Sequence, residues 1–225
     1  MKKDLAEVLI TLGIVGVIAA ITIPGLMTAY RKKVIETRLV KFYTIINQAI
    51  KLAEADYDDR TGWDILGSGF IKDEEGNNTD IAISQAWVEK YIIPYIKSDI
   101  KMTNKSGKVQ LYFPDGSMVA ISGSSWLFYP DAAKYRLTEE GIIDENSATG
   151  KFVFTFFYNP NCSHKTDCKF VSNGVEPYKY GWDGTKEDLF NGRYGCAKSG
   201  AVKAYCTEII KQNGWKFPSK YPVKL

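Results

Sequence analysis

Residues 5–29 of the chain read LAEVLITLGIVGVIAAITIPGLMTA, and residues 8–29 of this stretch carry no charged side chain. A helix that crosses the hydrocarbon core of a bilayer needs about 20 apolar residues. The run therefore predicts a membrane-spanning helix. A cleaved secretory signal fits less well, because its apolar part is usually about 7–15 residues long and ends at a small-residue cleavage site. A buried helix of a soluble core is the third alternative.

Two residues interrupt the apolar run. Glu7 lies at its N-terminal edge, where a carboxylate either benefits from the helix dipole or waits for a cation on a partner. Pro24 lies inside the run and removes one backbone donor, so we expect the helix to kink or loosen near residues 20–22. Both residues are candidates for a role in assembly.

The helix is expected to continue beyond the run, because residues 30–58 contain no glycine or proline. We therefore predict one helix over about residues 4–57, on the order of 80 Å long and broken only at Pro24. Its second half has an apolar stripe at helical spacing and a basic opposite face. The stripe consists of Val34, Ile35, Leu39, Phe42, Ile45, Ile46, Ala49, Ile50 and Ala53, and the basic face of Arg31, Lys32, Arg38, Lys41 and Lys51.

The segment KKDLAEVLITLGIVGVIAAITIP, residues 2–24, resembles the N-terminus of type IV pilins and type II secretion pseudopilins. In that family a glutamate near the start of the apolar helix is followed 17 residues later by a proline, as Glu7 is by Pro24. The resemblance implies a structural subunit of a pilus-like or pseudopilus filament. Its N-terminal helices would pack together, with Glu7 neutralised by an amine of a neighbouring copy.

The resemblance also implies where the chain resides and what it meets. The subunit would wait in the cytoplasmic (inner) membrane with its head outside, then enter a periplasmic or cell-surface filament. Its partners would be further copies or other pilin-like subunits, the assembly platform of the inner membrane, and prepilin peptidase. Alignment on Glu7 places Lys2 where this peptidase requires glycine, so the resemblance does not extend to the cleavage site.

The charges that flank the apolar run favour the opposite orientation, with the head inside. Lys2 and Lys3 precede the run, and residues 31–33 (RKK) follow it. The positive-inside rule alone would place the head in the cytoplasm. The resemblance and the cysteines discussed below favour a head outside, and this is the orientation that we expect.

The rest of the chain predicts an α+β head with a small antiparallel sheet packed on the long helix. We thus expect three parts: an apolar helix over residues 1–29, its amphipathic continuation over 30–58, and a globular head over 59–225. A hairpin is expected at 108–113 and 117–122, because Pro114 and Gly116 suit the turn between them. The other expected elements are helices at 81–96 and 197–210 and strands at 141–144 and 151–158.

Four cysteines form two close pairs, Cys162 with Cys168 and Cys196 with Cys206. Disulfides suit an exported chain, and short loops favour local pairing, although four cysteines allow three pairings. Each bridge would stabilise by roughly 2–3 kcal/mol. The Cys196–Cys206 pair also resembles the C-terminal bridge of pilins in position. The alternative, a zinc site at Cys162, His164 and Cys168, has poor ligand spacing.

No catalytic motif is evident, and we predict no enzymatic activity and no cofactor. The chain has one histidine and a formal net charge of +3, which excludes multi-histidine metal sites and argues against binding nucleic acid by bulk charge. A solvated turn is the main interpretation of residues 144–146 (DEN), with calcium as the alternative. The alternative function is a single-span, membrane-anchored extracytoplasmic binding or hydrolytic module. The C-terminal aromatic residues Trp215, Phe217 and Tyr221 are expected to pack on the sheet.

Overall fold

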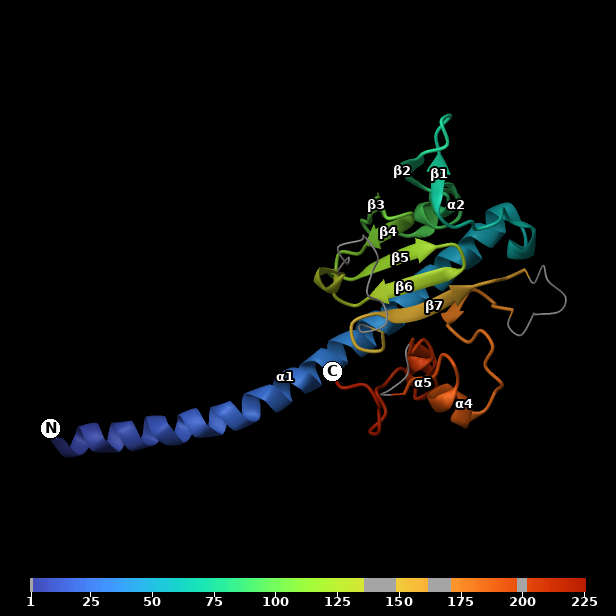
Figure 1. Cartoon of the computed structure of the whole chain (residues 1–225). Coiled ribbons are helices and arrows are strands. Elements are labelled where there is room, and N and C mark those ends of the chain that lie inside the picture. Colours follow the sequence, from blue (N-terminus) through green and yellow to red (C-terminus); the bar gives the residue numbers. More distant parts are fainter. Residues whose placement is uncertain (1, 136–148, 162–170, 198–201) are drawn as a thin grey trace.

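The computed structural model describes residues 2–135, 149–161, 171–197 and 202–225. Its first element, α1 (Lys2–Tyr57), is a single helix of 56 residues. At 1.5 Å per residue it is about 84 Å long. One part of α1 lies along the head, and the other extends away from it to the N-terminus (Figure 1). The expected long helix is confirmed, as are its packed second half and the α+β class.

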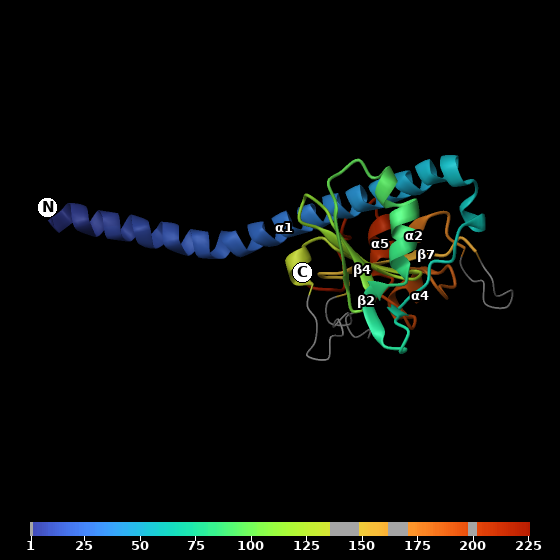
Figure 2. The ribbon, with the colours of Figure 1, turned by 90° about the horizontal axis from the view of Figure 1, so that it is seen from above.

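The helix does not break at Pro24. The α-helical backbone is continuous from Lys2 to Tyr57, and the helix changes direction between its free part and the part along the head (Figure 2). A proline in a helix removes one N–H donor, and here the backbone on either side stays helical. The expected break at Pro24 is therefore wrong, whereas the expected kink or loosening near residues 20–22 stays a prediction.

The head is built on a six-stranded antiparallel sheet whose spatial order follows the chain. Each strand has three to five residues, and consecutive strands pair directly, as Val119 with Phe128. The strands are β3 (Lys101–Lys105), β4 (Lys108–Tyr112), β5 (Met118–Ser122), β6 (Ser125–Tyr129), β7 (Phe154–Tyr158) and β8 (Val175–Pro177).

The predicted hairpin is confirmed as β4 and β5. Phe113 donates its backbone N–H to Ser117 at 2.9 Å, and Gly116 donates to Phe113 at 3.0 Å. Gly116 has a φ of +79°, a conformation in which glycine avoids the strain of a side chain. Strand β7 starts at Phe154, three residues later than expected.

Alternation along the strands builds two cores, because successive side chains point to opposite faces. One face packs on α1 and contributes Val109, Leu111, Val119, Ile121, Trp126, Phe128, Phe154 and Phe156. The opposite face buries a smaller cluster of Met118, Ala120, Leu127, Tyr129 and Val153. The sheet is thus covered on both sides, and α1 is one of its covers.

The expected helix over 81–96 is shorter than predicted. Ile81 and Ala82 belong to strand β2 (Asn78–Ala82), which pairs with β1 (Phe70–Lys72) in a separate two-stranded sheet. Helix α2 (Ser84–Tyr91) follows, and the segment containing Pro94 is a single 3₁₀ turn. The apolar residues Ile81 and Ala82 form the end of a strand. Apolar spacing alone could not distinguish this strand end from the start of a helix.

The C-terminal region carries two short helices, α4 (Lys186–Asn191) and α5 (Cys206–Gln212). The helix expected over 197–210 therefore begins later, since residues 202–205 are not helical. Its end is as predicted at Asn213–Gly214: Trp215 donates to Ile210 and Gly214 to Lys211, the pair of bonds that closes a Schellman motif. The strand expected at 141–144 lies outside the described residues.

Candidate functional site

The free half of α1 is the most unusual surface of the molecule. From Val8 to Tyr30 almost every side chain is exposed, including Ile21 at 74% and Leu26 at 70%. Burying one large apolar side chain is worth about 1.5–3 kcal/mol, so leaving this many in water is strongly unfavourable. Among the described residues α1 is the one helix long and apolar enough to cross a membrane. Its length and composition are those of a membrane anchor or a signal sequence.

The hydroxyl groups of the threonines in the free half all donate hydrogen bonds within the helix. Thr11 donates to the carbonyl of Val8 at 2.9 Å, and Thr22 donates to Ile18 at 2.9 Å. Thr28 donates to the carbonyl of Pro24 at 3.0 Å. Polar groups placed in an apolar medium must be satisfied within the protein, and these three are.

The two predicted assembly residues both lie on this half. Pro24 is near the middle of α1, and Glu7 lies in its second turn, although the structure describes no side chain for residues 2–7. Between them, a Cβ placed on Gly13 or Gly16 would meet nothing within 4 Å, so both glycines lie on open helix surface. Small residues on such a surface allow another helix to approach closely.

The other half of α1 is part of the core of the head. Its buried positions include Leu39, Ile46 and Ile50, as the predicted stripe required. Phe42 stacks on Phe128 of β6 with ring centroids 4.4 Å apart and lies edge-on to rings from neighbouring segments. The head is therefore assembled around this half, and the free half continues the same helix.

The predicted basic face of α1 is only partly solvated. Arg38 donates to the backbone carbonyls of Pro130 and Asp115, and Lys41 contacts the Asp115 carboxylate at 2.9 Å. These two cations therefore hold the β4–β5 turn against the helix. The expectation of an exposed face holds for Arg31 and Lys51 but is wrong for Arg38, because the head folds back over that position.

The C-terminal segment closes over α1 from another side. Glu36 is buried and accepts the backbone N–H of Phe217 at 2.9 Å, with Lys216 at 3.2 Å. Trp215 packs against Tyr43 with centroids 5.0 Å apart and stacks on Phe156 of the sheet. The expected packing of the aromatic tail on the sheet is confirmed, and α1 shares in it.

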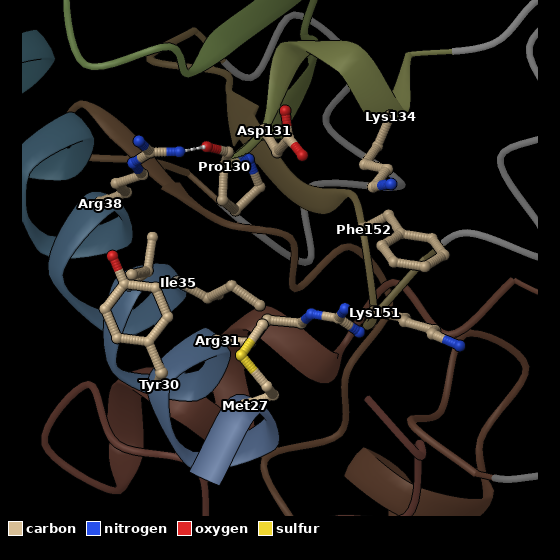
Figure 3. Close-up of a pocket in the computed structure, with 11 residues that line it drawn as sticks. Met27, Tyr30, Arg31, Ile35, Arg38, Pro130, Asp131, Lys134, Lys151 and Phe152 are labelled. Carbon is tan, nitrogen blue, oxygen red and sulfur yellow. Dashed lines mark hydrogen bonds between the residues drawn. The ribbon is translucent and has the colours of Figure 1, made fainter. Parts of the chain in front are cut away.

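A cleft of about 220 Å³ opens where α1 leaves the head (Figure 3). Its helix side presents Met27, Tyr30, Arg31, Val34, Ile35 and Arg38, and its head side presents Pro130, Asp131, Lys134, Lys151 and Phe152. The cleft thus combines an apolar lining with several cations. We refer to these eleven residues as the junction cleft.

The Cys196–Cys206 disulfide is confirmed, with Cα atoms 4.7 Å apart. It joins α5 to the loop after α4 and lies in a small cluster with Leu189, Tyr205 and Ile209. The second pair, Cys162 and Cys168, lies outside the described residues, as do His164 and the calcium candidates at 144–146. Among the residues that the structure does describe, no group of three potential metal ligands comes together.

Sequence reasoning missed the contacts that hold α1 in the head. The residues responsible are polar and sit among apolar neighbours: Glu36, Arg38 and Asn47. Their partners are backbone groups of Phe217, Pro130, Asp115 and Val175, far away in the chain. The apolar periodicity of a helix shows that such polar residues lie next to a buried stripe, but it does not predict which backbone groups they bind.

Comparison with known proteins gives one match. No curated protein and no solved structure is significantly similar to the chain. One family profile, described as a family of unknown function, matches residues 25–225, which include the whole head and the packed half of α1. Residues 1–24, which carry most of the resemblance to pilins, are outside the match. The chain belongs to this family, DUF6613.

Proposed function

We propose that the chain is a structural subunit of a type IV pilus-like or type II secretion pseudopilus filament, stored in a membrane and assembled through its N-terminal helix. One observation carries the proposal: a single uninterrupted helix is core of the head over one half and exposed and apolar over the other. A simple tether needs an apolar span, but it does not need that span to be the helical continuation of a core helix.

The free half has two environments that relieve its exposure. Residues 8–29 as helix measure about 33 Å, enough for the roughly 30 Å hydrocarbon core of a bilayer. In a filament the same surface packs on copies of itself, with Gly13 and Gly16 permitting close approach. Transfer from lipid to a bundle of helices exchanges one apolar environment for another, so it needs no refolding of the head.

In this proposal, Glu7 sets the stagger between neighbouring subunits. A carboxylate within an apolar bundle is strongly unfavourable unless a cation neutralises it. An amine on an adjacent copy would meet this need only when two helices are in one register. The pairing therefore selects a particular stagger between subunits, whereas apolar packing alone tolerates several.

The test is a Glu7→Ala variant of the full chain, expressed with its assembly machinery. Membrane insertion is measured by carbonate extraction, and filaments are measured by shearing and electron microscopy. We expect insertion to be unchanged and filaments to be lost. Glu74→Ala, which removes an exposed acid from the β1–β2 turn, is the matched control and should assemble normally.

The alternative of a membrane-anchored binding or hydrolytic module makes the opposite prediction. A tether should tolerate Glu7→Ala in every respect and should form no filament with the wild-type chain either. Protease accessibility of the head in intact and opened cells measures the orientation independently. With the proposed location, an added protease should cleave the head once the protease reaches the outer side of the cytoplasmic membrane.

A further inference from the structure

The junction cleft lies at the level where the apolar half of α1 ends. Residues 8–29 as helix span about 33 Å, so Tyr30 and Arg31 fall at the boundary between hydrocarbon and headgroups if this segment crosses a bilayer. Tyr30 is 66% exposed, as expected of an aromatic residue at such an interface. The head side of the cleft comes to the same level, since its residues line the same space as Met27 and Arg31.

Three cations surround the cleft without a carboxylate partner among the described residues. Arg31 comes from α1, Lys134 from the 3₁₀ turn Ala132–Lys134, and Lys151 from the segment before β7. The described ion pairs include none of them. Within the described lining of the cleft, Asp131 is the one acidic residue, against the four cations Arg31, Arg38, Lys134 and Lys151. The cleft is therefore a concentration of positive charge.

An aromatic ring gathers two of these cations. The Lys151 ammonium lies 4.8 Å from the centre of the Phe152 ring, and the Lys134 ammonium lies 5.8 Å from it. In Figure 3 these lysines lie on either side of Phe152, and Arg31 extends toward Lys151 from the helix. Attraction to the ring keeps two like charges near one another. An anionic group that enters the cleft would be attracted by all three charges.

Apart from Arg38, which donates to the carbonyls of Pro130 and Asp115, the remaining lining of the cleft is largely apolar and continues the surface of the free helix. Met27, Val34 and Ile35 lead from the exposed half of α1 into the cleft. A ligand that fits must therefore offer a compact anion beside a long apolar part that lies along α1. A phospholipid with a net negative headgroup has this form, and juxtamembrane Lys and Arg clusters attract such lipids.

We propose that the junction cleft binds the headgroup of one anionic phospholipid, with Arg31, Lys134 and Lys151 around the headgroup and the acyl chains along α1. The proposal rests on the membrane-spanning part of the proposed function but not on filament formation. It gives the cations after the span a role on the outer side of the membrane. The bound lipid would hold the waiting subunit at a fixed depth and would be given up when the helix leaves the bilayer.

Native mass spectrometry of the full-length chain tests the proposal. The protein is held in neutral detergent with equal amounts of phosphatidylglycerol and phosphatidylcholine, and the lipids that it retains are counted. We expect phosphatidylglycerol to be retained about tenfold or more over phosphatidylcholine. The triple variant R31Q/K134Q/K151Q should retain the two equally, because apolar binding to the free helix does not depend on headgroup charge.

The matched control K72Q/K101Q/K105Q removes three exposed lysines from β1 and β3 and should keep the wild-type preference. Near-ultraviolet circular dichroism of each variant verifies that the head is folded. Equal retention of both lipids by the wild-type chain, or equal loss of preference in both triple variants, would overturn the proposal. So would displacement of the lipid by millimolar inorganic phosphate, which would identify a soluble anion as the ligand.

Glu7→Ala separates this proposal from that of filament assembly. It should keep the preference for phosphatidylglycerol, since Glu7 is far from the cleft along α1. If instead R31Q/K134Q/K151Q abolishes filaments while the wild-type chain shows no lipid preference, the cleft is a contact for a neighbouring subunit and the lipid proposal is wrong.

Discussion

The side-chain amide of Asn47 on α1 pairs with both backbone groups of Val175 on β8. Its nitrogen donates to the Val175 carbonyl at 2.9 Å, and its oxygen accepts the Val175 N–H at 2.9 Å. Strand β8 is an edge of the sheet, so one of its residues is paired by a helix side chain rather than by another strand. A Cβ on the adjacent Gly174 would collide with the Asn47 oxygen, so this position must be glycine.

Replacement of Asn47 by leucine should destabilise the head by about 1–3 kcal/mol, because two partly buried backbone groups lose their partner. Urea unfolding of the full chain in detergent, followed by near-ultraviolet circular dichroism, measures the change. Gln48→Leu replaces the amide side chain at the next, exposed position by leucine and should change stability by less than about 0.5 kcal/mol. Equal effects of the two variants would show that the Asn47–Val175 pair contributes nothing specific.

Gly150→Ala should be more damaging than Gly184→Ala. Both glycines have positive φ, +79° and +91°, so both variants bear the strain of a side chain in that region. At Gly150 the new Cβ would also lie 2.6 Å from Sγ of Cys206, whereas at Gly184 nothing lies within 4 Å. We expect a difference in melting temperature of several degrees between the two variants. Identical melting temperatures would exclude the steric contribution.

Loss of the Cys196–Cys206 bridge should cost roughly 2–3 kcal/mol, since the cross-link closes a short loop. The double variant C196A/C206A should melt lower than the wild-type chain under oxidising conditions. Titration with a reductant should lower the melting temperature of the wild-type chain more than that of the double variant. If a reductant shifts both chains by the same amount, the bridge does not stabilise the fold.

Asp115 should make the head sensitive to acid. Burial raises the pKa of this carboxyl, but hydrogen bonds from Ser117 and the Lys41 ammonium outweigh burial and leave the pKa below its ordinary value. The stabilisation is therefore fully present above about pH 4, the ordinary aspartate range, and is lost as the pH falls through the lowered pKa.

Asp115→Asn tests this sign. The variant should be less stable than the wild-type chain at pH 7, and the gap should narrow as the pH falls toward 2. Melting temperatures across that range measure it. A gap that stays constant with pH would mean that the ionised carboxylate contributes nothing beyond the shape of the side chain.

The sequence predicted those elements that local rules decide. Residues 8–29 specify an apolar helix by composition, Leu39 to Ala53 specify a buried stripe by spacing, and Pro114 with Gly116 specifies a hairpin by turn chemistry. Each of these signals lies within one short segment. The errors have the opposite character, because the helix over 81–96 lost its start to a pairing with Phe70, and the helix over 197–210 starts only at Cys206.

The candidate site divides in the same way. The apolar half of α1, with Glu7 and Pro24, was recognisable from adjacent residues. The junction cleft was not, because Arg31, Lys134 and Phe152 are brought together only when the head folds around α1. Among these residues, Arg31 alone stood out in the sequence as part of a basic run.

The unbroken path of α1 through Pro24 has a mechanical consequence. No non-helical segment separates the free half of α1 from the head, so a rotation of the free half about the helix axis is passed on to the head. When the free halves of several copies pack together, the rotation of each helix about its own axis decides which faces of adjacent heads meet. The arrangement of heads on the outside of an assembly would thus be set by helix packing far from the heads. One substitution on the free half of α1 would change the orientation of every head.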